Sequence, residues 1–155
     1  MESTNEKTLF EVSEIQLSYK SKVKASLRPK ISSSRDAENI LRQYWNDDLL
    51  EFQEEFKIML LNRTIKSFGI FTASSGGIAG TVADPKLIFA CALKGAASGI
   101  ILAHNHPSGS LQASQADIDL TKKLRDGGKL LDIQILDHVI MTSELYYSFA
   151  DEGLL

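Results

Sequence analysis

Two of the three histidines in the chain, His104 and His106, are separated by a single residue. Alternate residues of an extended chain point to the same side, so both imidazoles can reach one ion. Further along the chain, Ser114 and Asp117 stand at a predicted helix start. Two imidazoles and one carboxylate suit Zn²⁺ and leave its fourth tetrahedral position for water, as in catalytic zinc sites. The spacing therefore predicts a catalytic metal centre with one Zn²⁺ per chain.

A second interpretation of the same residues needs no metal. Ser114 and Asp117 have the spacing of a capping box, in which each satisfies a backbone amide at a helix start. The two histidines favour the metal interpretation, because paired loop histidines without such a role are uncommon in a chain with so few of them.

Composition limits the kind of protein. The 155 residues weigh 17.1 kDa and are 43% hydrophobic and 24% charged, values typical of one globular domain. A single cysteine, Cys91, excludes a disulfide framework and a cysteine-based zinc ribbon. With 17 basic and 20 acidic residues the net charge is −3, which does not support nucleic acid as a partner. No apolar run could cross a membrane and the first residues do not resemble a secretory signal, so a cytoplasmic protein is expected.

The elements that must position these residues follow from apolar periodicity. Residues 1–33 are predicted to form an N-terminal arm with a short edge strand at Ile15, Leu17 and Tyr19. The basic run from Lys20 to Arg35 is interpreted as a solvated strand edge. Residues 34–155 are predicted to form the domain, an α/β (α+β) fold with a mixed β-sheet flanked by helices. Within it we expect strands at 54–61, 65–72, 99–103, 131–136 and 137–142. Helices are expected at about 34–45, 84–97 and 114–128, with a turn at 76–80 and a loop at 104–113.

The string His104-Asn-His106-Pro-Ser-Gly, followed by Ser114 and Asp117, resembles the signature of JAMM metalloproteases, the catalytic subgroup of the JAB/MPN domain. Its fuller form resembles the RadC branch, often labelled "DNA repair protein RadC". The resemblance runs from about residue 54 to the C-terminus and includes Asp137-His138-Val-Ile. It implies a JAB/MPN fold related to cytidine deaminases. The helix-hairpin-helix region typical of longer RadC proteins is not found in this sequence.

The resemblance also implies roles for the motif residues. His104, His106 and Asp117 would be the zinc ligands, and Ser114 would donate a hydrogen bond to the oxyanion. The family further needs an upstream glutamate as general base, for which Glu54 and Glu55 are the candidates and Glu51 a remote third.

Alternation along the strand at 54–61 favours Glu54. Glu54 shares a face with the apolar residues of the strand, whereas Glu55 shares one with Lys57, which suggests solvent. The Glu-x-Phe pattern of the family also selects Glu54. His138 is expected to have a hydrogen-bonded structural role or to support a ligand, and Cys91 to be a small buried hydrophobe.

These features predict a zinc-dependent hydrolase that acts on amide, peptide or isopeptide bonds of an unknown substrate. The alternative is a RadC-type accessory module associated with DNA repair or mobile elements, with weak or no peptidase activity. A zinc nucleotide deaminase is excluded, because the chain has no His-x-Glu and no Cys-x-x-Cys. Oligomerisation is left open.

Overall fold

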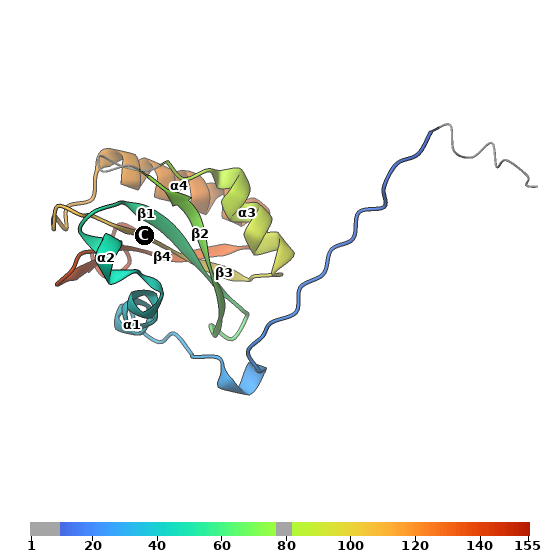
Figure 1. The fold of residues 1–155 in the computed structure, drawn as a ribbon, viewed down its shortest axis with the longest axis horizontal. Coiled ribbons are helices and arrows are strands. Elements are labelled where there is room, and N and C mark those ends of the chain that lie inside the picture. The colour runs from blue at the N-terminus through green and yellow to red at the C-terminus, as the bar shows by residue number, and fades with distance from the viewer. Residues whose placement is uncertain (1–9, 77–81) are drawn as a thin grey trace, which may run out of the picture.

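A five-stranded mixed sheet forms the centre of the protein, with strand order β2-β1-β3-β4-β5 (Figure 1). The computed structural model describes residues 10–76 and 82–155. β1 is antiparallel to β2 and β3, β3 is parallel to β4, and β4 is antiparallel to β5. The strands are β1 (Glu55–Leu61), β2 (Ser67–Ser75), β3 (Gly99–Asn105), β4 (Gln134–Met141) and β5 (Tyr146–Ser148). The predicted mixed sheet flanked by helices is confirmed.

Helices cover both faces of this sheet (Figure 1). The helices are α1 (Ser34–Tyr44), α2 (Asp47–Leu50), α3 (Pro85–Lys94) and α4 (Gln115–Leu130), preceded by a 3₁₀ turn, η2 (Ala25–Leu27). α3 and α4 pack on one face through Ile88 and Leu124, and α1 packs on the other through Leu41. None of the helices in the described ranges is both long and apolar enough to span a membrane.

Because both faces are covered, every residue of β1 is buried. Phe56, Ile58 and Leu60 face α3 and α4, as alternation predicted. The expectation that Glu55 and Lys57 face solvent is wrong, since only 9% and 6% of their surfaces are exposed. The side of the sheet that alternation assigned to water is occupied by α1 and the residues after it. The Lys57 ammonium lies 5.1 Å from the centre of the Trp45 ring and donates to Thr72 Oγ1.

Several predicted boundaries are corrected. β3 continues through His104 and Asn105, so the loop begins only at His106. α4 does not end at Gly127-Gly128 but includes both glycines. A Cβ atom on Gly128 would lie 2.3 Å from the carbonyl oxygen of Ile133, so glycine here permits a close approach between α4 and the chain entering β4. The two predicted closing strands are one, β4, which has a register shift at the predicted division: Ile100 pairs with Ile135, and Ile101 pairs with Asp137. The Asp137 carboxylate accepts hydrogen bonds from the Ser148 hydroxyl and from the backbone amides of His138 and Ala150.

The N-terminal arm also differs from expectation. Residues 10–20 are extended but belong to no strand of the sheet, so the predicted edge strand is not formed within a single chain. The chain first pairs with the sheet through its backbone at Lys30, which bridges to Lys66 just before β2. The predicted helix at Asp84 is confirmed but ends at Lys94. The predicted turn at 76–80 lies, apart from Gly76, outside the described residues.

Candidate metal centre

Two imidazole nitrogens meet at the end of β3. The Nε2 atoms of His104 and His106 are 2.9 Å apart. His104 is the penultimate residue of β3, is 1% exposed, and its ring stacks on Phe56 of β1. His106 follows the strand directly and is held to β4, because its backbone N–H donates to the carbonyl of Met141. The strand pairing therefore fixes the relative position of the two rings.

The hydrogen-bond network assigns the proton on His106. Its Nδ1 atom lies 2.7 Å from the backbone carbonyl oxygen of Ser110, which can only accept a hydrogen bond. Nδ1 must therefore carry the proton, and in the neutral ring Nε2 is an unprotonated donor atom for a metal.

Three buried hydrogen bonds in series show that the neutral ring of His104 is also protonated at Nδ1. Thr121 Oγ1 donates to the carbonyl of Asp117 at 2.7 Å, so this hydroxyl must accept from His138 Nδ1, 2.6 Å away. Full burial lowers the pKa of His138 well below its usual range, which keeps the ring neutral with Nε2 unprotonated. His138 Nε2 therefore accepts from His104 Nδ1 at 2.7 Å, so Nε2 is the unprotonated nitrogen in the neutral tautomer of His104.

This arrangement tests whether the residues fit a metal ion. Two unprotonated nitrogens at 2.9 Å repel each other unless a cation or a proton lies between them. Neutral imidazoles with Nδ1 hydrogen-bonded to a fixed acceptor are the usual form of histidine ligands. The donor set fits a divalent ion that prefers nitrogen and oxygen ligands, such as Zn²⁺.

Asp117 brings negative charge to the two histidines. Its Oδ1 lies 3.4 Å from His104 Nε2 and its Oδ2 lies 3.7 Å from His106 Nε2. Burial opposes ionisation of Asp117, but the contacts with His104 and His106 outweigh it and hold its pKa well below the usual range. The ionised carboxylate is the form that a metal requires.

The capping-box interpretation is confirmed. Ser114 Oγ accepts from the backbone amide of Asp117 at 3.1 Å, and Asp117 Oδ2 accepts from the backbone amide of Ser114 at 2.9 Å. The two interpretations are compatible, because the cap anchors Oδ2 while Oδ1 faces His104. Ser114 is exposed and its hydroxyl proton is not used by the cap, so it remains available to a ligand.

Glu54 lies beside the histidines, whereas Glu55 does not. Ligand atoms of Glu54, His104 and His106 all lie within 4.8 Å of one another. Burial raises the pKa of Glu54, and the neighbouring His104 and His106 partly offset this effect. Glu55 points to the opposite side of β1, where its carboxylate accepts from Ser75 and lies 3.7 Å from the Lys57 ammonium. The geometry thus brings together Glu54, His104, His106 and Asp117.

Two residues that support this cluster are not evident from the sequence motif. Thr121 lies one helical turn after Asp117, a spacing that could have indicated a shared face of α4. Asn105, between the two histidines, is fully buried and holds the segment before β1: its Oδ1 accepts from the amide of Glu55 at 2.7 Å and its Nδ2 donates to the carbonyls of Leu50 and Gln53 at 2.9 Å. Asn105 therefore fixes the backbone that carries Glu54.

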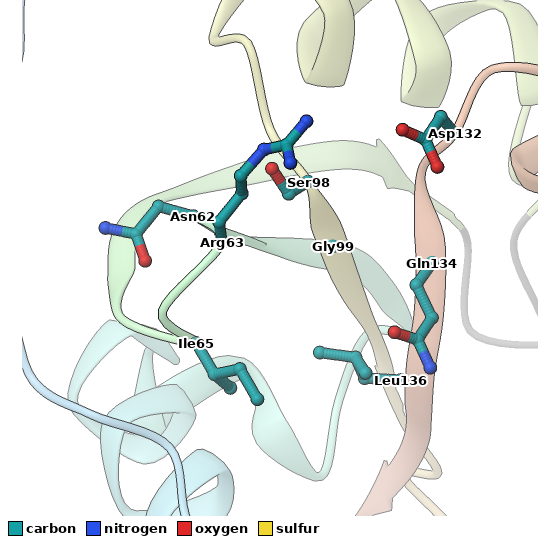
Figure 2. Close-up of a pocket in the computed structure, with 8 residues that line it drawn as sticks. All are labelled: Asn62, Arg63, Ile65, Ser98, Gly99, Asp132, Gln134 and Leu136. Carbon is teal, nitrogen blue, oxygen red and sulfur yellow. The ribbon is translucent and has the colours of Figure 1, made fainter.

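A cavity lies at the end of the sheet opposite the histidine cluster. It has a volume of about 250 Å³ and is formed by the β1–β2 turn and the first residues of β3 and β4 (Figure 2). Arg63, Ser98 and Asp132 line it together with five further residues. None of its lining residues belongs to the histidine cluster, so the candidate centre is at the other end of β3.

Comparison with known proteins identifies the family of the chain. Residues 31–154 match the RadC-like JAB domain family. The chain is 46% identical over 125 residues to a UPF0758 protein of Flavobacterium johnsoniae, covering 81% of this chain and 53% of that protein. It is 41% identical over 129 residues to a UPF0758 protein of Porphyromonas gingivalis, covering 83% and 56%, respectively.

The fold and the histidine cluster are those expected of a JAB-type domain that can hold a metal ion. The chain belongs to the RadC-like JAB domain family, as its match over residues 31–154 shows. It spans about half the length of the curated relatives that it matches.

Proposed function

We propose that this protein is a zinc-dependent hydrolase that cleaves an amide, peptide or isopeptide bond. The observation that carries the proposal is the 2.9 Å approach of two imidazole nitrogens, each the unprotonated nitrogen of its ring when that ring is neutral, next to the ionised Asp117. His104, His106 and Asp117 would hold the ion. Zinc supplies a polarising charge and lowers the pKa of water toward neutrality.

Glu54 is suited to move the proton in this reaction. Its carboxylate lies within 4.8 Å of the histidine nitrogens and its pKa is raised by burial. A base with a raised pKa accepts a proton from the attacking water more readily and can then deliver it to the leaving amine. Asn105 assists by fixing the backbone on both sides of Glu54.

Ser114 is suited to stabilise negative charge on the carbonyl oxygen. Its hydroxyl oxygen already accepts a hydrogen bond from the amide of Asp117, so its proton is directed elsewhere. One donor to an oxyanion typically contributes about 10²–10³ in rate. The ionised Asp117 and the neutral His138 stay in fixed protonation states, so neither competes with Glu54 for the proton.

The test has two parts. Metal analysis of the purified protein should find one zinc ion per chain, removable by a chelator and restored by added Zn²⁺. The zinc-loaded protein and its Glu54→Gln variant are then incubated with peptides prepared from a bacterial lysate, and new peptide termini are identified by mass spectrometry. Cleavage by the wild type alone supports the proposal. Stoichiometric zinc with no cleavage by either form would favour the accessory-module alternative, and absence of zinc binding would contradict both metal and hydrolase.

A further inference from the structure

Five apolar side chains are exposed on residues 10–19 of the N-terminal segment. From here on, the arm means these ten residues. Phe10, Val12, Ile15 and Leu17 are 81–94% exposed and Tyr19 is 50% exposed. The segment is extended, and Figure 1 shows it in blue running away from the body of the protein. Ile15, Leu17 and Tyr19 alternate with polar residues, so an extended backbone directs these three side chains to one side. The arm therefore has the form of a strand without a sheet.

The edge of the sheet offers such a strand a place to pair. β2 is the outermost strand on its side. At its start, the chain at Pro29–Ile31 pairs with it: Ser67 donates to Pro29 and Ile31 donates to Ile65, both at 2.9 Å. Beyond Ser67, no other segment within residues 10–76 and 82–155 forms backbone hydrogen bonds with Gly69–Phe71 on this outer side. Unpaired edges of this kind are templates for another strand.

An apolar groove adjoins the same edge. It has a volume of about 420 Å³ and lies between β2 and α3. Its walls are mainly apolar side chains, namely Leu60, Ile70, Phe71, Leu87, Ala90 and Cys91. Leu87 is 48% exposed, and Cys91, which we expected to be fully buried, is only partly covered. A strand on the β2 edge would bring alternate side chains over this groove.

The charges of the arm and of the groove are complementary. The arm contains two acidic residues, Glu11 and Glu14, and no basic one. The groove contains no acidic residue among those that line it, but it does contain Lys94. Opposite charges at the rim of an apolar contact set its register and favour the correct partner.

We propose that the arm of a second copy of this chain adds to the β2 edge and fills this groove, so that two copies exchange arms. Tyr19, at the base of the arm, already lines the groove of its own copy, where its hydroxyl lies 3.5 Å from the carbonyl of Phe68. Each arm thus leaves from the rim of the groove that the partner's arm fills. Reciprocal exchange across one interface closes with twofold symmetry. The ten residues of the arm span about 33 Å when extended, slightly more than the nine-residue strand β2.

The first experiment measures the oligomeric state of the full chain by sedimentation velocity at micromolar concentration. The wild type should be a dimer. Ile15→Asp with Leu17→Asp should raise the dimer dissociation constant at least about a hundredfold, because each arm would bury two unpaired charges. The matched control, Gln16→Asp with Ser18→Asp, adds the same charge to the other side of the arm and should leave the constant within about threefold. A monomeric wild type, or equal effects of the two pairs, would overturn the proposal.

The second experiment distinguishes exchange from docking of the arm on its own groove. Cys91 is the only cysteine of the chain, so Leu17→Cys introduces one partner for a short bis-maleimide linker. Arm exchange predicts a covalent dimer on a denaturing gel, and Ser18→Cys should give much less of it. A link within one chain, or no preference for position 17, would contradict the proposal. The inference does not depend on the metal chemistry, because the arm variants leave the histidine cluster intact.

Discussion

Thr121 and His138 form a 2.6 Å hydrogen bond inside the protein, and this bond determines which nitrogen is protonated in the neutral ring of His104, the next residue in the network. Because the Thr121 hydroxyl donates to the carbonyl of Asp117, it can only accept from His138, and His138 in turn can only accept from His104. The network joins α4, β4 and β3, so packing of the helix on the sheet decides which nitrogen of His104 is free.

Removal of the Thr121 hydroxyl should release this constraint. In Thr121→Val, His138 can rotate or adopt its other tautomer, and zinc affinity should fall by about 10–100-fold, the usual effect of losing a hydrogen bond behind a ligand. Thr121→Ser retains the hydroxyl and should keep the affinity within a few-fold. Affinity is measured by competition with a chromogenic chelator. Nitrogen-15 NMR of the metal-free protein should show His104 protonated at Nδ1 in the wild type but mixed in Thr121→Val; unchanged spectra would contradict the assignment.

Replacement of a single ligand should remove zinc without unfolding the protein. His106 lies after β3 and belongs to neither apolar core cluster, so His106→Ala removes little of the core. We expect less than stoichiometric zinc by elemental analysis and an unchanged circular dichroism spectrum. Gln112→Ala, an exposed change before α4, serves as the control and should keep one zinc per chain. Full zinc retention by His106→Ala would show that this residue is not a ligand.

The two neighbouring glutamates should have different effects. Glu54→Gln keeps the shape of the side chain but cannot accept a proton, so turnover should fall by about 10²–10⁴-fold with zinc content unchanged. Glu55→Gln should lower turnover by less than about tenfold. It should instead reduce the free energy of unfolding by about 1–3 kcal/mol, because Lys57 loses its buried counter-charge. Turnover and urea unfolding are measured on both variants; a large loss of turnover in Glu55→Gln alone would reverse the assignment.

Zinc binding should weaken as the pH falls. The contact with Asp117 raises the pKa of His106 above its usual value of 6.5. Zinc must displace this proton, so affinity is highest above the raised pKa and should fall about tenfold per pH unit below it. Asp117, with its pKa far below the usual range, stays ionised and adds no proton in this window. Chelator competition between about pH 6 and 8 measures the slope; constant affinity across this range would argue against His106 as a ligand.

Local sequence patterns predict most of the helices and strands and the histidine motif. Apolar periodicity predicts most of β1 and β3, although it assigns Glu54 to the first strand and His104 to a loop, whereas β1 begins at Glu55 and β3 continues through His104. The spacing of His104 and His106 places both rings on one side of an extended chain. The capping pattern at Ser114 gives the start of α4. Each of these features depends on residues close together in the chain, and local backbone geometry is enough to specify them.

The surroundings of these elements depend on contacts between distant segments, which are seen only in the folded protein. Alternation assigns Glu55 and Lys57 to one face of β1, but it cannot show that α1 covers that face and buries both side chains. The protonation of His104 depends on Thr121 and His138, which are 17 and 34 residues away in the chain and meet only when α4 packs on β4. Burial and hydrogen-bond partners depend on contacts between distant segments. The periodic patterns of strands and helices involve only neighbouring residues and therefore cannot predict these contacts.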